Sequence, residues 1–119
     1  MKIEIVQIAD RGKANMERIH LKVLADTVLS YYVILNTSYT TPNSISNNPK
    51  HVFWFPSFSV KAGDQVILYT GLGNQKSELS LIGKHNHFFY WGQNATLLNK
   101  IGDCVVLLEI SSWQTSKYE

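Results

Sequence analysis

The stretch that decides the fold is residues 88–110, FFYWGQNATLLNKIGDCVVLLEI. Two apolar runs, residues 88–91 and 104–108, are joined by a polar link with a glycine near each end. Apolar residues at successive positions place apolar side chains on both faces of a strand, which is typical of a strand enclosed between layers. We therefore expect two core strands. The 104–110 strand is predicted to be central and to pair with an N-terminal strand or with residues 88–91.

Similar short runs recur along the chain. Residues 3–8 alternate and then change phase at Val6, which predicts a strand with a β-bulge. No apolar stripe at helical spacing extends over ten residues. Seven or eight short strands without covering helices predict an all-β, antiparallel immunoglobulin-like β-sandwich. The other expected strands are residues 19–23, residues 28–36 ending at Asn36, residues 51–55, residues 65–70 and a short edge strand at residues 79–82.

Length and composition limit the possibilities. The chain has 119 residues, of which 45% are hydrophobic, enough for one compact domain. We assign residues 1–112 to that domain and residues 113–119 to a polar tail anchored by Trp113. No run of about 18 apolar residues occurs, and Glu4 interrupts the first apolar run, so we expect a soluble chain without a signal peptide or membrane span. The compartment stays open.

Cys104 is the only cysteine, which excludes an internal disulfide and a multi-cysteine zinc site. It lies in the most apolar run of the chain. A reactive thiolate needs a partly exposed, electropositive setting, so we expect Cys104 to be a buried, slowly reacting side chain.

Three pieces of the sequence follow one another in a recognisable order: residues 32–37 (YVILNT), residues 55–56 (FP) with 61–71 (KAGDQVILYTG), and residues 90–92 (YWG) with 98–107 (LNKIGDCVVL). Gly63 and Gly102 permit positive φ in tight turns, and Asp64 and Asp103 can accept hydrogen bonds from nearby backbone. Together these pieces resemble lamin tail domains, the immunoglobulin-like sandwiches of nuclear lamins that also occur in bacterial proteins. One strand of that family, a short "L-S-G-W-x-L" segment, is represented here only by Ile45-Ser46.

The resemblance implies a non-catalytic module that binds protein partners and, in some relatives, DNA. We therefore expect a binding or scaffolding module that is not an enzyme and uses no cofactor. This expectation is an analogy with proteins of the same fold. Its partner is an unknown protein, and the chain is expected to be a monomer or a homodimer formed through an edge strand.

Residues 37–50, TSYTTPNSISNNPK, offer little to bury and predict a long surface loop. Long loops in compact domains are often functional. Tyr39 and Ile45 are the anchors we expect to contact a partner, together with the sheet edge that the missing family strand would leave unpaired.

His85 and His87 suggest an alternative, a metal-dependent hydrolase that also uses an acid such as Asp103, because residues two apart on a strand share a face. A zinc site needs three or four ligands, so we favour solvated histidines without a metal. No nucleophile elbow of the G-x-S-x-G type occurs.

Weak nucleic-acid binding is a third possibility. Residues 84–91 interleave basic and aromatic residues, as some single-strand-binding sheets do. Charged residues make up only 17% of the chain and the net charge is +2, so few phosphate contacts are available. Burial of these aromatic residues is the simpler expectation.

Overall fold

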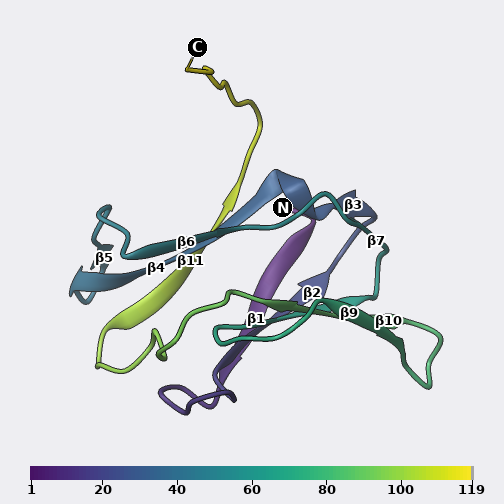
Figure 1. Cartoon of the computed structure of the whole chain (residues 1–119), viewed down its shortest axis with the longest axis horizontal. Helices are drawn as coiled ribbons and strands as arrows, with labels where there is room; N and C mark the ends of the chain where they lie inside the picture. Colours follow the sequence, from purple (N-terminus) through teal and green to yellow (C-terminus); the bar gives the residue numbers. More distant parts are fainter. Residues whose placement is uncertain (119) are drawn as a thin grey trace.

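The computed structural model describes residues 1–118, and its regular secondary structure is almost entirely β-strand, arranged in two main sheets that face each other (Figure 1). The predicted all-β sandwich is confirmed. The five-stranded sheet has the order β1 (Ile3–Ala9), β2 (Arg18–Val23), β8 (Gln65–Tyr69), β10 (His85–Tyr90) and β9 (Lys76–Leu79). The four-stranded sheet places β4 (Tyr32–Thr41) between β11 (Asp103–Glu109) on one side and β5 (Ser44–Ile45) and β6 (His51–Trp54) on the other; β3 (Thr27–Val28) pairs with β7 (Ser59–Val60) at the side.

The core lies between the two sheets and follows from the alternation of side chains along the strands. β2 buries Ile19, Leu21 and Val23 on one face and leaves its other residues partly or fully exposed. β4 contributes Tyr32 and Ile34 from the opposite sheet. The bulge predicted in the first strand is confirmed by a register shift between residues 5 and 7 of β1.

The five-stranded sheet contains one parallel pair, β8 with β10, whereas every other described strand pair is antiparallel. After β8 the chain forms β9 at the sheet edge and returns as β10 between them. The edge strand expected at residues 79–82 is therefore displaced to Lys76–Leu79. Leu81 and Ile82 instead lie exposed in the turn that Gly83 closes by donating its N–H to the Ser80 carbonyl.

The prediction that the 104–110 strand is central was wrong. β11 lies at the edge of its sheet, and among the described strands it pairs with β4 rather than with β1 or β10. The link between β10 and β11 crosses from one sheet to the other and buries Leu97 and Leu98 on the way. β10 and β11 follow each other in the chain, but they belong to different sheets and face each other across the core instead of pairing.

The expected strand at residues 28–36 is broken by a 3-10 turn, Leu29–Tyr31, that buries Leu29. β4 begins after this turn and continues beyond Asn36 to Thr41. Asn36 does not end the strand, because its side chain is buried and its Oδ1 accepts the N–H of His51 at 2.9 Å. This contact fixes the start of β6 against the middle of β4.

The segment predicted to be a long loop, residues 37–50, is only partly a loop. Its first part completes β4, and β5 pairs back on it in a hairpin. Thr37 is buried, with its hydroxyl donating to the Ser46 carbonyl at 3.0 Å. Ile45 thus belongs to the short strand β5, and the loop shortens to residues 46–50.

Beyond β11 the tail extends away from both sheets (Figure 1). Trp113 is 68% exposed and lies edge-on to Trp54, with ring centroids 6.0 Å apart. Glu119, the last residue of the predicted tail, lies outside the described residues. Within residues 1–118, no helix is long and apolar enough to cross a membrane.

Candidate binding face

The outward side of the four-stranded sheet is apolar. Ile34, Phe53, Val105 and Leu107 point into the core, so their neighbours along each strand point outward. The strand registers place these outward residues side by side across β6, β4 and β11. We call this surface the apolar face; it consists of Val33, Leu35, Val52, Trp54, Val106 and Leu108.

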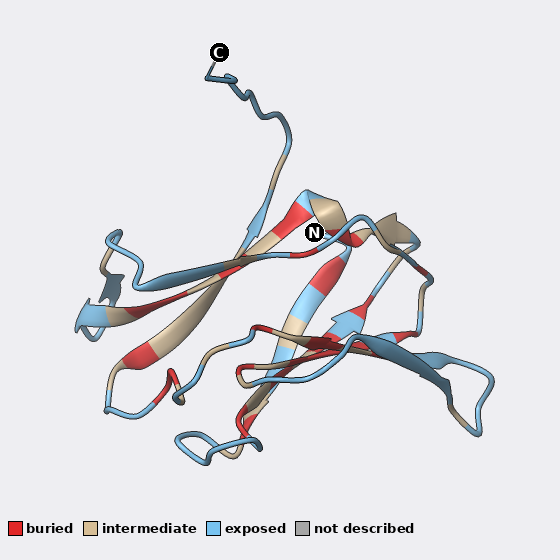
Figure 2. Cartoon of the chain, viewed as in Figure 1, coloured by how far each residue is buried: buried red, intermediate tan, exposed pale blue. Residues whose placement is uncertain are grey.

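Much of the apolar face is open to solvent. Val52 is 55% exposed, Trp54 52% and Leu108 44%. Figure 2 shows β6 as a largely exposed strand on the outside of the sandwich. A cluster of large apolar side chains on an outer sheet face is the kind of surface that marks a contact site.

No charged side chain lies among the described outward residues of the apolar face. Glu109, at the end of β11, belongs to the opposite side, where its carboxylate accepts the Tyr32 hydroxyl at 2.7 Å. Lys50 is at the border, with its Nζ 3.7 Å from Asp103 Oδ1. A partner on this face would therefore meet almost purely apolar contacts.

A depression of about 300 Å³ indents the apolar face next to β5. Apolar side chains dominate its floor, and the 46–50 loop forms one wall. It is lined by Leu35, Ile45, Ser46, Asn47, Pro49, Val106 and Leu108.

The two predicted partner residues lie together at this end of the face. Tyr39 and Ile45 are directly opposite each other on β4 and β5, and they are 52% and 45% exposed. Ile45 lines the depression. The sequence did not reveal Val52, Trp54 and Leu108 as surface residues, because an apolar run looks the same whether its second face meets another layer or solvent.

Trp54 is held in place on the apolar face. Its indole Nε1 donates to the Ser30 carbonyl at 2.8 Å, and its ring contacts Trp113 edge-on. A large aromatic ring that is both exposed and fixed loses little side-chain entropy on binding, which is the property of an interface anchor.

Cys104 is half-buried rather than buried, because it lies on β11 at the edge of the sheet, opposite Thr37. Burial raises the pKa of its thiol, and the nearby Asp103 carboxylate raises that pKa further. The thiol therefore stays protonated at neutral pH.

The outward side of the five-stranded sheet has a different character. It carries Arg18 and Lys76, with Tyr69 and Tyr90 stacked at 5.3 Å. Arg18 is paired with Asp10 at 2.6 Å, and Lys76 lies over the Phe88 ring.

The aromatic residues on that side, Tyr69, Phe88 and Tyr90, are only partly exposed. A Cβ added to Gly73 would approach the Tyr90 ring to 2.3 Å, so the loop backbone lies directly against that ring. Phe89, in the middle of the predicted basic and aromatic segment, points to the other side of the sheet and is buried in the core. The arrangement leaves little free aromatic surface for stacking bases.

The two histidines of the alternative hydrolase differ in environment. His85 is exposed, as expected, but His87 is buried, so the prediction that both are solvated was wrong for His87. Their rings stack at 5.7 Å. His87 lies 3.0 Å from Asp64 Oδ2 through Nε2 and 2.7 Å from the Ser77 hydroxyl through Nδ1.

Asp103 does not join the histidines. Its Oδ2 accepts the N–H groups of Asn99 and Lys100 in the turn before β11, whereas the carboxylate beside His87 belongs to Asp64. Within residues 1–118, no three His, Cys, Asp or Glu side chains gather closely enough to hold a metal ion.

Gly63 and Gly102 adopt positive φ, 92° and 93°, as the turn interpretation predicted. Asp64 follows the first of these glycines and accepts the N–H groups of His85 and Lys61. Burial raises the pKa of Asp64, but these bonds and the contact with His87 outweigh burial and lower it. Asp64 is therefore a carboxylate at neutral pH.

Glu17 is a buried carboxylate that the sequence analysis did not identify. It is 1% exposed and precedes β2. Its oxygens accept the N–H groups of Gly12, Leu97 and Leu98 at 2.7–3.1 Å and the Thr70 hydroxyl at 2.9 Å. The residues next to Glu17 in the sequence do not indicate that N–H groups some eighty positions away will donate hydrogen bonds to its carboxylate.

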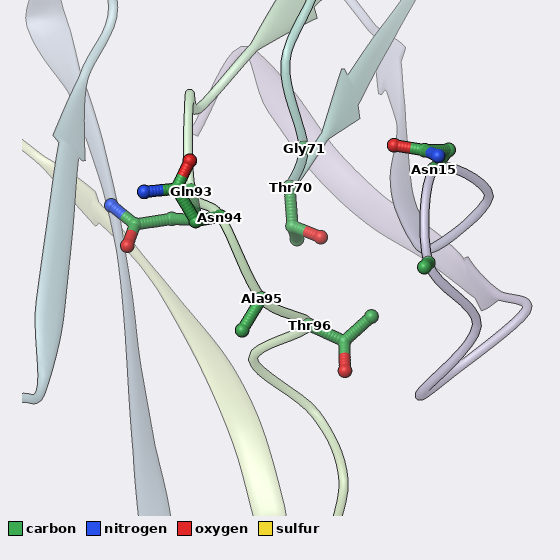
Figure 3. A pocket seen from close by; sticks show the side chains of 8 residues that line it. Asn15, Thr70, Gly71, Gln93, Asn94, Ala95 and Thr96 are labelled. Carbon is green, nitrogen blue, oxygen red and sulfur yellow. The ribbon is translucent and has the colours of Figure 1, made fainter.

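A small cavity lies at the same end of the sandwich (Figure 3). Residues 93–96 of the β10–β11 link and Asn15 stand on either side of Thr70 and Gly71. Its volume of about 30 Å³ suits one or two water molecules and excludes an organic ligand.

The search against protein-family models and the search of curated proteins returned no match for this chain.

Proposed function

We propose that this chain is a protein-binding module and that its partner docks on the apolar face. The single observation that carries the proposal is the alignment of exposed Val52, Trp54 and Leu108 on the outer side of one sheet without a charged residue among the described outward positions. Exposing such a cluster in an isolated chain is unfavourable because apolar area stays in contact with water. A partner that covers it gains that free energy.

The chemistry of the face defines the partner. A charge-free surface disfavours a charged partner, because each charge brought against it would lose hydration without gaining an ion pair. The partner should therefore present an uncharged, apolar protein surface with a side chain that fills the depression beside Ile45. Tyr39 would lie at the rim of the contact.

The sequence resemblance to lamin tail domains supports the same proposal. The resemblance rests on the motifs in residues 32–37, 55–56 with 61–71, and 90–92 with 98–107, and it implies a module that contacts protein partners. The resemblance also implies a module that is not an enzyme; the hydrogen-bonded Ser77, His87 and Asp64, argued below to be catalytic, put that expectation to the test.

The test compares two valines with equal exposure. Val52 on β6 and Val6 on β1 are each 55% exposed, but only Val52 belongs to the apolar face. Proteins captured from a lysate of the source cells by the unmodified chain, Val52→Lys and Val6→Lys would be compared quantitatively. We expect Val52→Lys to reduce capture of a specific protein by at least about tenfold, as loss of an anchor costs more than about 1.4 kcal/mol, and Val6→Lys to leave it unchanged.

The same variants test self-association. Sedimentation of the purified chain would show a second copy as the partner if the unmodified chain and Val6→Lys form dimers and Val52→Lys does not. Equal capture by both lysine variants, with equal sedimentation, would refute the apolar face as the contact surface.

A further inference from the structure

Three side chains from separate elements meet at the edge of the five-stranded sheet. Asp64 lies in the turn before β8, His87 on β10 and Ser77 on β9, where Ser77 and His87 are directly opposite each other. The hydroxyl of Ser77 is 2.7 Å from Nδ1 of His87, and Nε2 of His87 is 3.0 Å from Oδ2 of Asp64. A continuous hydrogen-bonded chain therefore runs from a buried carboxylate to a surface hydroxyl.

The carboxylate fixes which nitrogen of the imidazole carries the proton. Asp64 is ionised and can only accept, so Nε2 of His87 must donate to it. In the neutral imidazole, Nδ1 then has a free lone pair and accepts the Ser77 hydroxyl. This is the tautomer that a general base needs in order to remove a proton from serine.

The surroundings hold the imidazole and leave the serine accessible. His87 and Asp64 are 5% and 3% exposed, and Phe58 packs against the imidazole ring at a centroid distance of 5.0 Å. Ser77 is exposed on the edge strand. A surface depression of about 340 Å³ opens at this point, lined by Phe58, Ser59, Lys61, Asp64, Ser77, His85 and His87.

We propose that Ser77 is a nucleophilic serine, with His87 as its general base and Asp64 as the positioning residue, and that it accepts acyl groups from activated esters. Serine hydrolases use the same three groups, although there the serine faces Nε2 and the aspartate faces Nδ1. In this chain the imidazole of His87 has the opposite orientation, with Nδ1 facing Ser77 and Nε2 facing Asp64. Either ring nitrogen can act as the base when the carboxylate holds the proton on the other.

The reaction balances with water as the second substrate. Ser77 Oγ attacks the carbonyl carbon while its proton passes to Nδ1 of His87, and the bond to the leaving alcohol breaks as that alcohol takes up the proton. Water then hydrolyses the acyl-serine, which releases a carboxylic acid and restores the hydroxyl. Lys61 lines the same depression and is largely exposed, with its Nζ 3.9 Å from Asp26 Oδ2.

The first experiment uses a fluorophosphonate, which reports a nucleophilic serine directly. Attack by Ser77 Oγ on phosphorus forms a serine phosphonate, fluoride leaves, and the hydroxyl proton passes through His87 to solvent. We expect intact-mass analysis to show one added phosphonyl group and peptide mapping to place it on Ser77. Ser59→Ala serves as the matched control because Ser59 lines the same depression and is also exposed.

Labelling should disappear in Ser77→Ala, persist in Ser59→Ala, and fall at least about tenfold in His87→Gln if the base contributes as general bases usually do. Circular dichroism would check that each variant is folded. Ser77→Ala removes one hydroxyl from an exposed edge strand, so it should fold even if His87→Gln does not.

Hydrolysis of p-nitrophenyl acetate supplies the second measurement. We expect the folded chain to release nitrophenolate at least about 100-fold faster than Ser77→Ala. Absence of a label on Ser77, equal labelling of the folded and the urea-unfolded chain, or equal hydrolysis by Ser77→Ala would each overturn the proposal.

Discussion

The two sheets enclose the same core but differ in where they carry charge. The five-stranded sheet has charged residues on its outer side, such as Arg18 and Lys76, and two buried carboxylates at its ends, Glu17 and Asp64. The four-stranded sheet presents an outer face on which the described outward residues carry no charge. A buried carboxylate also holds a turn of the four-stranded sheet, where Asp103 accepts the N–H groups of Asn99 and Lys100 before β11. The contrast between the sheets therefore lies in their outer faces, of which only that of the four-stranded sheet is apolar.

The buried carboxylates of Glu17 and Asp64 also differ from each other. Glu17 is enclosed by backbone N–H groups and the Thr70 hydroxyl, so its contacts end within the fold. Asp64 accepts two backbone N–H groups as well, but it also holds His87, and through it Ser77 at the surface. Glu17 and Asp64 are similarly buried, but the hydrogen bonds of Glu17 end inside the protein, whereas those of Asp64 lead through His87 to Ser77 at the surface.

The largest effect is expected for Glu17→Ala. The change leaves the N–H groups of Gly12, Leu97 and Leu98 without their acceptor, and each unsatisfied buried group costs about 1–3 kcal/mol. We expect the free energy of unfolding in urea to fall by at least about 3 kcal/mol. Glu78→Ala, on exposed β9, is the control and should stay within about 0.5 kcal/mol. Equal losses for the two variants would refute the structural role of Glu17.

Asp64→Asn should have the next largest effect. The amide keeps the shape of the side chain but has one acceptor oxygen, where the carboxylate serves the N–H groups of Lys61 and His85 and the imidazole of His87. We expect a loss of about 1–3 kcal/mol in the same urea measurement. If Asp64→Asn and the unmodified chain had equal free energies of unfolding, these hydrogen bonds would make no net contribution to stability.

Acid should destabilise the chain through the carboxylates of Asp64 and Asp103. For Asp64 and Asp103, burial raises the pKa, but hydrogen bonds outweigh it and hold the pKa below the ordinary value of 3.8. The unfolded state therefore binds protons first, so stability is complete above the unfolded pKa and is lost as pH falls through the lower folded pKa. We expect stability to decline below about pH 5, and Asp64→Asn to show a shallower decline. A parallel decline in both proteins would exclude Asp64 as a source.

Cys104→Ser should have a smaller effect, because Cys104 is half-buried at a sheet edge, where water can reach a hydroxyl. We expect the unfolding free energy to fall by less than about 1 kcal/mol. The thiol of the folded chain should react with a maleimide more slowly than that of the urea-unfolded chain, since its raised pKa keeps it protonated. Equal rates would show that the edge of β11 opens readily.

The smallest effect on stability is expected at the apolar face itself. Val52→Lys and Val6→Lys both replace side chains that are 55% exposed, and surface substitutions usually change stability by about 0.5 kcal/mol or less. Thermal unfolding should give similar midpoints for both variants and the unmodified chain. A large loss for Val52→Lys alone would mean that the face supports the fold, and the distinction between the two sheets would fail.

Local sequence determined the strand pattern and the main turns. Alternation along residues 19–23, the phase change near Val6, and the Gly-Asp turns at residues 63–64 and 102–103 depend on neighbours in the chain, and the structure confirms each. Tyr39 and Ile45 could be selected as exposed for the same reason, because they stand among polar residues. Their role in partner binding stays a prediction.

Only the tertiary structure decided which strands pair and which polar groups are buried. The apolar run at residues 104–108 is compatible with a central or an edge strand, and its edge position depends on the link that crosses between the sheets. Glu17 contacts Leu97 across eighty positions of sequence, and Ser77, His87 and Asp64 meet only because β9 and β10 fold back beside β8. Such contacts are set by long-range topology, for which local residue patterns carry no information.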